Sequence, residues 1–589
     1  MRSAMTRNTL YGFALALALF ILLSPAASRA GVGRVICVPW QGDPGKFHTA
    51  VSGVEVRLKG VIETTDTGPV WYRWVFGDGT QSPVASLNGG LRYNVEALHI
   101  YSGAVGTPFT AQLQVDGVDS SMANAVSDPY LVKIEQDNLD ARVNMAIDEG
   151  LWWLFNNNYT HSYLHTFDGS EFMVWRQWDY ISDAFASPTA SAIQAFAINN
   201  HKINGDPEED PYVRAVRLGM NWLLQGYRYD GRWPMLQAVA ISAQAQGNPD
   251  ANGNGYGVEV RDYENRPVYQ GGQIIDAIIA SGVLPGDDTG RDFTGRGSNW
   301  TFGELMQDLC DTYAWGQVDS GTYRGGWRYS WNHESDNSAA QWAAIGLIPA
   351  QEPPWNCVVP GWVKTENAIW LGYSYNAGHF GYLNSGSQHD WYFNTTPSGM
   401  VQMAMDGQVG YDDPATPDDE RDPKWAAAEA YMADNWNGFL HNKSYNWGED
   451  LTYGWYAFAK AMRLAVPHPV VRVTKSDGTT FDWYLGSGDI KGMARRIIEI
   501  QQPSGAWDGS LTNAPLTTAW MIIVLRPALF AAAPVACFTA EPNPTFPDRD
   551  VAFDPSCSTH SETDKDIDNL VLFQWDWDND GTYDESTDE

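Results

Sequence analysis

Tryptophan, histidine and carboxylate side chains gather in Gly-rich turns of the central part of the chain. Aromatic rings stack on the C–H faces of sugars, and a pair of carboxylates can carry out acid and base steps on a glycosidic bond. We therefore expect a glycan site there. The candidate ligand-binding residues are Trp327, Trp331, His333, Trp447 and Trp507, and the candidate catalytic residues are Glu334, Asp336, Glu449 and Asp450.

The same residues also have a purely structural interpretation. Each Trp can fill the junction between two helices, and an Asp or Asn before an apolar run can cap the helix that follows. The segment Asp336-Asn337-Ser338 before Ala339 has the pattern of such a cap. The sequence leaves both interpretations open and nominates no single acid–base pair.

A second group of carboxylates has the spacing of a calcium loop. Asp576, Asp578, Asp580 and Asp584 occupy loop positions 1, 3, 5 and 9, and Gly581 occupies position 6. Thr587 stands where such a loop has Glu. We expect either a calcium site or a solvated acidic turn.

Composition excludes some functions. The chain has 589 residues, with 71 Asp and Glu against 37 Lys and Arg, a formal net charge of −34. Nucleic-acid binding is excluded because phosphate contacts need clustered cations. The length predicts about three to five domains, and the 44% hydrophobic residues are enough to build packed cores.

The N-terminal segment predicts export. Residues 1–30 contain Arg2 and Arg7, an apolar run over 10–23 and a small-residue site at Ser28-Arg29-Ala30, which together are typical of a cleaved signal peptide. The alternative is a membrane anchor, although the run is short for a span. After cleavage no membrane span is expected, and the protein is predicted to be secreted or held at the cell surface.

Export permits disulfides. The spacing of the five cysteines suggests the pairs Cys310–Cys357 and Cys537–Cys557, with Cys37 alone. All five as free thiols is the alternative.

Residues 31–134 predict a β-sandwich, because runs such as Val54–Leu58 and Phe109–Val115 alternate apolar and polar side chains. The stretch Trp74-Val75-Phe76-Gly77-Asp78-Gly79-Thr80, followed by His99-Ile100-Tyr101, resembles the polycystic-kidney-disease (PKD) domain family. The Gly77-Asp78-Gly79 stretch predicts a hairpin turn with positive φ. Residues 531–589 resemble the first half of a second PKD domain.

Residues 135–530 predict six helical hairpins, each with a Gly- or Trp-rich turn. Six hairpins can close into an (α/α)6 toroid that leaves no exposed apolar end. The pairs are 146–155 with 191–197, 213–225 with 271–279, 302–313 with 338–348, 366–373 with 397–405, 425–439 with 452–464, and 490–501 with 517–525.

Two stretches of this region resemble the repeat of the squalene-cyclase and protein-prenyltransferase superfamily. They are Gln501-x-x-x-Gly505-x-Trp507, and Gly325-Gly326-Trp327 with the following Ser335–Ala343. The resemblance implies an α/α toroid with a central cavity. The Asp-x-Asp-Asp motif of the cyclases is absent from the sequence, and a prenyltransferase-like zinc site would have to combine Asp308 and Cys310 with a distant His333. Neither family activity is therefore favoured.

The predicted fold class is a multidomain protein with an all-α (α/α)6 toroid core flanked by all-β, immunoglobulin-like PKD sandwiches. The predicted function is an exported binding or structural protein whose toroid cavity binds a glycan, with an extracellular glycan or a surface protein as partner. The alternative is a secreted polysaccharide lyase or glycoside hydrolase that uses the cavity carboxylates. A terpene-cyclase-like enzyme is the least favoured. Calcium is the one candidate cofactor.

Overall fold

The computed structural model describes residues 31–38, 47–159, 164–178, 183–227, 234–262, 266–387, 392–412, 419–441, 450–509 and 514–526, and four short strands after them. The chain divides into two compact units, one of residues 1–152 with 205–214 and the other of residues 153–204 with 215–589. Among the described residues, no helix is long and apolar enough to cross a membrane. The predicted signal peptide, residues 1–30, lies outside the described residues, and the predicted domain boundaries stay predictions.

Unit 1 contains two sheets. The first is antiparallel, in the order β1-β3-β6, and the second has the order β2-β8-β7-β4-β5 with β2 parallel to β8. The strands are β1 (Arg34–Cys37), β2 (His48–Val51), β3 (Glu55–Glu63), β4 (Val70–Val75), β5 (Ala85–Leu87), β6 (Arg92–Ile100), β7 (Pro108–Asp116) and β8 (Val126–Glu135).

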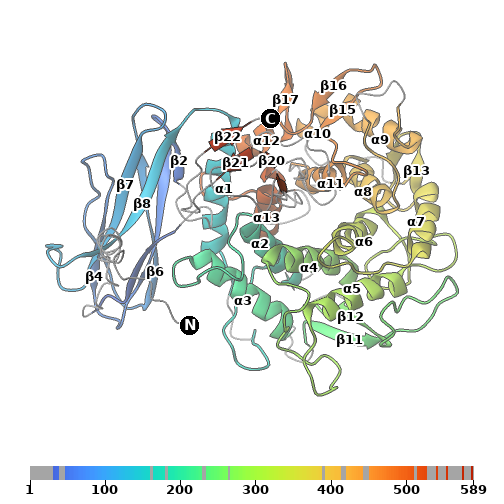
Figure 1. The fold of residues 1–589 in the computed structure, drawn as a ribbon, viewed down its shortest axis with the longest axis horizontal. Helices are drawn as coiled ribbons and strands as arrows, with labels where there is room; N and C mark the ends of the chain where they lie inside the picture. Colours follow the sequence, from blue (N-terminus) through green and yellow to red (C-terminus); the bar gives the residue numbers. More distant parts are fainter. Residues whose placement is uncertain are drawn as a thin grey trace, which may run out of the picture. The chain divides into compact units, whose positions relative to one another are not determined.

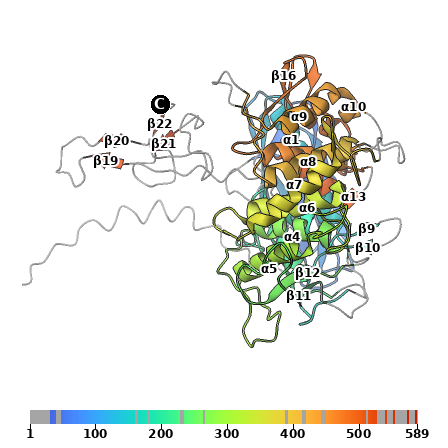
Figure 2. The same cartoon turned by 90° about the vertical axis from the view of Figure 1, so that its right-hand side faces the viewer.

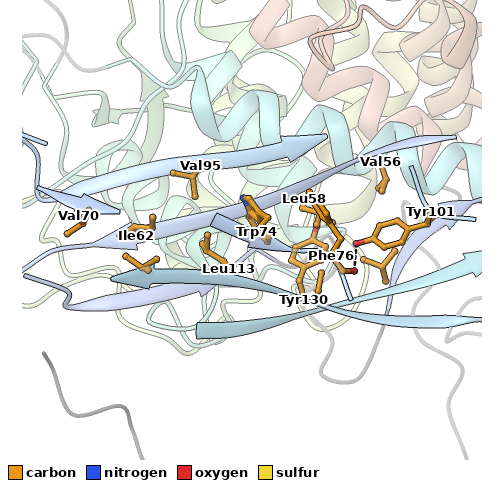
Figure 3. Close-up of a cluster of buried hydrophobic side chains, with 14 of the residues drawn as sticks. Val56, Leu58, Ile62, Val70, Trp74, Phe76, Val95, Tyr101, Leu113 and Tyr130 are labelled. Atoms are coloured by element: carbon orange, nitrogen blue, oxygen red, sulfur yellow. Dashed lines mark hydrogen bonds between the residues drawn. The ribbon is translucent and has the colours of Figure 1, made fainter. Parts of the chain in front are cut away.

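Alternating side chains of these strands build one hydrophobic core (Figure 3). Leu58 of β3, Trp74 of β4, Leu113 of β7 and Tyr130 of β8 are all buried in it. The alternation places every second residue of a strand on the same face, so the period-two pattern of the sequence becomes the inner face of each sheet. The PKD resemblance itself stays a prediction.

The turn after β4 forms as predicted. Gly77 has φ +81° and Gly79 has φ +93°. A Cβ on Gly77 would lie 2.5 Å from the carbonyl oxygen of Thr110, so both conformation and space require glycine there. The Asp78 carboxylate accepts a hydrogen bond from the Thr80 amide at 2.9 Å and pairs with His99 at 2.7 Å.

A largely buried ionic cluster joins the middle of helix α1 (Leu139–Asn156) to strand β3, and α1 belongs to unit 1 up to Trp152. Lys59 of β3 is fully buried and pairs with Asp148 and, at 3.3 Å, with Glu149. Arg57, two residues earlier on the same strand, also pairs with Glu149, at 2.8 Å. These charges satisfy one another away from water, as buried charges must.

A helix forms over each segment of the six predicted hairpins, and most of these helices lie in unit 2. In the order outer helix then inner helix they are α1 with α2 (Ala186–Ala197), α3 (Pro211–Gln225) with α4 (Pro267–Ser281), α5 (Phe302–Gly316) with α6 (Asn337–Ala350), α7 (Gly361–Ser374) with α8 (Tyr392–Met405), α9 (Pro423–Asp434) and α10 (Trp436–His441) with α11 (Thr452–Arg463), and α12 (Met493–Glu499) with α13 (Ala514–Leu525).

The inner helices form a closed ring (Figure 1). Each contacts the next in the order α2, α4, α6, α8, α11, α13, and α13 contacts α2 again. Figure 2 shows the ring from the side, where α4, α6 and α8 follow one another. All twelve residues of α2 are buried, which is the pattern of a helix covered on every face. The coarse fold class, a mixed helical and sheet protein with an α/α toroid, is therefore confirmed.

The axis of the ring is filled with side chains in the described part of the chain. Trp342 of α6 stacks on Trp520 of α13, with ring centroids 5.5 Å apart, and Tyr456 of α11 stacks on both. Lys460 of α11 also pairs with Asp276 of α4, on the opposite side of the ring. The expected central cavity is wrong for this depth of the toroid, because side chains from opposite helices meet across the axis and fill it.

Short hairpins connect the helices of unit 2. They are β9 (Gln177–Trp178) with β10 (Asp183–Ala184), β11 (Leu236–Ala240) with β12 (Tyr256–Val260), β13 (Tyr375–Asn376) with β14 (His379–Phe380), β15 (Arg472–Thr474) with β16 (Thr480–Asp482), and β17 (Gly486–Ser487) with β18 (Ile490–Lys491). Near the end of the chain β19 (Thr539–Glu541) pairs with β20 (Ala552–Asp554), and β21 (Phe573–Trp575) with β22 (Glu585–Thr587).

Cys310 and Cys357 are free, buried thiols that lie together in the structure. A hydrogen bond between the two thiols and their burial raise the pKa of Cys310. We expect oxidation with glutathione disulfide to join them, as in exported proteins generally. Peptide mass spectrometry without reduction should find the 310–357 link, while Cys37, whose thiol contacts the Asp128 carbonyl oxygen, stays alkylatable. Recovery of Cys310 and Cys357 as separately alkylated peptides would contradict this expectation. The second suggested pair, Cys537 and Cys557, lies outside the described residues.

Candidate functional site

The N-terminal ends of three inner helices meet at one mouth of the ring. Tyr269 of α4 hydrogen-bonds to the hydroxyl of Ser338 in α6, and the Tyr453 hydroxyl of α11 donates to the Ser338 carbonyl oxygen at 2.8 Å. All three residues lie in the first turn of their helix. This junction supports the side chains that the connecting segments bring above it.

Two connecting segments contribute those side chains. The segment between α5 and α6 brings Arg328, Tyr329, Glu334 and Asp336, and the segment before α8 brings Tyr382. The mouth cluster is defined here as Tyr269, Arg328, Tyr329, Glu334, Asp336 and Tyr382.

Arg328 joins the two predicted catalytic carboxylates of the cluster. Its Nη1 pairs with Glu334, and its Nε lies 3.3 Å from Asp336 Oδ2. The Glu334 side chain is 33% exposed, whereas that of Asp336 is fully buried. The sequence therefore nominated two carboxylates that the fold does bring together, but in very different surroundings.

Asp336 also caps helix α6, as the structural interpretation expected. Its Oδ1 accepts hydrogen bonds from the Ala339 amide and the Ser338 hydroxyl, both at 2.7 Å. Burial raises the pKa of Asp336, while these hydrogen bonds and the Arg328 charge act in the opposite direction. A carboxyl whose pKa is raised by burial can hold a proton closer to neutral pH.

Tyrosine rings form the aromatic part of the cluster. The hydroxyls of Tyr329 and Tyr382 lie 2.7 Å apart, and the rings of Tyr269 and Tyr329 have centroids 5.8 Å apart. The guanidinium groups of Arg266 and Arg328 lie 4.9 and 5.1 Å from the centre of the Tyr329 ring. Tyr269 and Tyr329 are both half-buried residues.

Two predicted ligand-binding tryptophans do not fit that role here. Trp327 and Trp507 are fully buried. Their indole nitrogens donate to the carbonyl oxygens of Tyr313 in α5 and Ile497 in α12, at 2.9 and 2.8 Å. Trp175 donates in the same way to Leu154 of α1, at 2.8 Å. These residues fill the junction between outer and inner helix in three repeats, which is the structural interpretation.

The other predicted residues are scattered. Trp331 is half-buried and donates to Glu259 of β12 at 3.1 Å, and His333 is exposed beside it in the chain. Asp450 is buried and accepts from Arg496 of α12 at 2.6 Å, which gives it an anchoring contact. Trp447 and Glu449 lie outside the described residues, as do the predicted calcium ligands Asp576, Asp578, Asp580 and Asp584.

Sequence reasoning missed the tyrosines and the arginine of the cluster. Arg328 and Tyr329 directly follow the Gly325-Gly326-Trp327 turn, and that position was the available signal. Tyr269 and Tyr453 recur in the first turn of two inner helices, which helix pairing could have revealed. Tyr382 carries no comparable signal, because only the fold brings it to Tyr329.

No family model matches the chain, and no curated protein matches it. Among solved structures it is similar to a family 76 glycoside hydrolase from a bovine Bacteroides thetaiotaomicron strain, at 8% identity and TM-score 0.33, covering 85% of this chain and 99% of the hydrolase. It is also similar to native Escherichia coli alpha-2-macroglobulin, at 10% identity and TM-score 0.27, covering 88% of this chain and 28% of that protein. Likenesses this weak carry no argument about function.

Proposed function

We propose that the mouth cluster binds a neutral glycan. The observation that carries the proposal is the junction at Ser338, where half-buried tyrosine rings stand beside an arginine and two carboxylates that are held in place. Aromatic faces with a few fixed polar groups are the usual composition of a sugar site. The polar groups are oriented by their own contacts before any ligand arrives, which lowers the cost of binding.

The charge of the chain supports a neutral ligand over an acidic one. The formal net charge of −34 repels polyanions over the molecule as a whole. Arg328 is also neutralised by its contacts with Glu334 and Asp336. An extracellular glycan, met after export, agrees with both the predicted signal peptide and this charge.

Replacing Tyr329 by alanine tests the binding proposal. We expect affinity for the best ligand of a neutral polysaccharide panel to fall at least about tenfold, or 1.4 kcal/mol, because the variant removes the central ring of the cluster. Isothermal titration calorimetry would measure it. The matched control is Tyr373→Ala, which removes an exposed tyrosine of outer helix α7 and should leave binding unchanged.

Two outcomes would count against the proposal. The first is equal binding by the parent protein and the Tyr329→Ala variant. The second is a preference for polyuronates over every neutral chain, because it would contradict the argument from charge.

Glycoside hydrolysis by the same cluster is the second candidate function. It is favoured by the contrast between the buried carboxyl of Asp336, whose pKa is raised, and the partly exposed carboxylate of Glu334. Two carboxyl groups in unlike surroundings can divide the acid and base roles of glycosidic cleavage. Lyase chemistry is the other form of this candidate, and it would produce unsaturated uronides in place of simple reducing ends.

An assay for new reducing ends or unsaturated uronides on each bound polysaccharide separates binding from turnover. If the chain is an enzyme, Asp336→Asn should abolish turnover and retain binding, since asparagine can still cap α6. If no polysaccharide that binds is cleaved, the binding function stands alone.

A further inference from the structure

A fully buried lysine lies between two carboxylates in unit 1. Strand β3 places Lys59 on the face opposite that of Leu58, which belongs to the hydrophobic core, because successive side chains of a strand alternate. Lys59 Nζ pairs with Asp148 Oδ2 and lies 3.3 Å from Glu149 Oε1. One amine and two carboxyl groups therefore share a site, and an amine and a carboxylic acid can condense to an amide with loss of water.

This site is closed off from bulk solvent. The Lys59 side chain has no exposed surface, and the Asp148 side chain is 10% exposed. The tyrosines nearby, Tyr130 and Tyr212, are essentially unexposed as well. Burial raises the pKa of both tyrosines, and the Asp148 charge acts in the same direction, which places the carboxylate close to their hydroxyls. Two charges in such surroundings cost folding free energy that a neutral amide does not cost.

Glu149 differs from Asp148 in its partners and its exposure. It accepts a hydrogen bond from Arg57 Nε at 2.8 Å, and its side chain is 24% exposed. Burial alone would raise the pKa of Glu149, but the charges of Lys59 and Arg57 outweigh burial and lower it. Glu149 is therefore a fixed carboxylate that can take a proton from Lys59 Nζ and hand it on.

We propose that Lys59 and Asp148 join in an intramolecular isopeptide bond, with Glu149 as the proton carrier. Within the ion pair, one proton passes from the Lys59 ammonium to the Asp148 carboxylate, which leaves a neutral amine beside a neutral acid. The Nζ lone pair then attacks Asp148 Cγ, and Glu149 takes a second proton from Nζ as the C–N bond forms. Glu149 returns that proton to the departing hydroxyl, the C–O bond breaks, and one water leaves.

This condensation needs no further reactant. The three protons of the Lys59 ammonium become one amide hydrogen and the two hydrogens of the released water, and Glu149 ends as the carboxylate it was. No electron is gained or lost. The fold favours the reaction in two ways, because groups held in contact react as if at very high concentration and because the product replaces two buried charges with one neutral amide.

The bond closes a covalent loop from Lys59 to Asp148 and fixes the middle of α1 to β3. Unit 1 contains a single cysteine, Cys37, so a disulfide within the unit cannot do the same. An amide restricts the unfolded chain as a disulfide does, but reduction does not open it. The bond and the glycan site are independent, because all three reacting residues belong to unit 1.

Mass spectrometry of the full chain, reduced and denatured, tests the proposal. The intact protein should be lighter by one water than its sequence requires from the observed N-terminus onward. Trypsin does not cut after an acylated lysine, so the digest should contain residues 58–73 joined to residues 143–176. Fragmentation should place the link between Lys59 and Asp148. The joined peptides distinguish this bond from loss of water by an aspartate alone.

Glu149→Gln separates a proton carrier from a structural residue. Glutamine keeps the size of the side chain but cannot carry the proton. We expect the link to form at least about a hundredfold more slowly in newly made protein, while the circular dichroism spectrum stays that of the parent. Lys133→Met is the matched control, because Lys133 of β8 is half-buried and pairs with Glu135 at 3.1 Å. This variant should form the link as the parent does.

Three outcomes would count against the proposal. An intact mass equal to that of the sequence, with residues 60–73 and 143–176 recovered as separate peptides, would overturn it and leave a structural ion pair. Equally fast linking in the parent and in Glu149→Gln would overturn the role of Glu149. A link through Glu149 in place of Asp148 would overturn the assignment of the reacting carboxyl group.

Discussion

Replacing Lys460 by methionine is expected to lower the free energy of unfolding by about 3–5 kcal/mol, one of the two largest effects predicted for this protein. Lys460 and Asp276 are essentially unexposed and lie 2.5 Å apart, on helices that face each other across the ring. Removing the lysine leaves the Asp276 carboxylate buried without its cation. Gln194, which donates to the same oxygen at 3.3 Å, cannot replace a charge.

A double-mutant cycle separates the penalty of leaving Asp276 unpaired from the free energy that the Lys460–Asp276 ion pair itself contributes to folding. Asp276→Leu combined with Lys460→Met should recover most of the loss, because no buried charge then remains. Urea denaturation followed by tryptophan fluorescence would measure all four proteins. Lys491→Met is the matched control. Lys491 pairs with Glu499 at 2.8 Å, but both side chains are more than a third exposed, at 34% and 41%.

Lys491→Met should lower the free energy of unfolding by less than about 1 kcal/mol, because water screens an exposed ion pair. Equal losses for Lys460→Met and Lys491→Met would show that the axial pair is not desolvated in solution. The account of a filled axis would then be wrong at this depth of the ring.

Gly272→Ala is expected to have the second largest effect and to lower the free energy of unfolding by about 3 kcal/mol. A Cβ on Gly272 of α4 would lie 2.0 Å from the carbonyl oxygen of Trp342 in α6. The neighbouring helix has no room to yield, since a Cβ on Gly346 would itself lie 2.9 Å from the Cα of Gly272. The substitution must push α4 and α6 apart and so disturb the closed ring.

Gly372→Ala provides the control within the same fold. Gly372 lies in outer helix α7, is exposed, and has no atom within 4 Å of the position of an added Cβ. Alanine should stabilise that helix by about 0.5–1 kcal/mol, because it restricts the unfolded chain. Thermal unfolding followed by circular dichroism would compare the two. Similar melting temperatures for both variants would contradict close packing of α4 on α6.

Local sequence information was sufficient for the elements of the fold. A helix forms over each predicted segment because apolar residues recur there at helical spacing and are interrupted by Gly- and Trp-rich turns. The turn at Gly77 was equally predictable, since positive φ at a glycine is a property of that residue alone. Asp336 as a cap follows from its position just before an apolar run.

Only the tertiary structure decided which of these residues are available for chemistry. Trp327 and Trp507 were indistinguishable from binding residues in the sequence, because burial depends on which helix lies over the ring. The mouth cluster depends on Tyr382 reaching Tyr329 from 53 residues away. The Lys460–Asp276 pair spans 184 residues, and it exists only because the ring closes and brings opposite helices together. Composition and period are local properties of a chain, whereas charge pairing and exposure belong to the closed toroid.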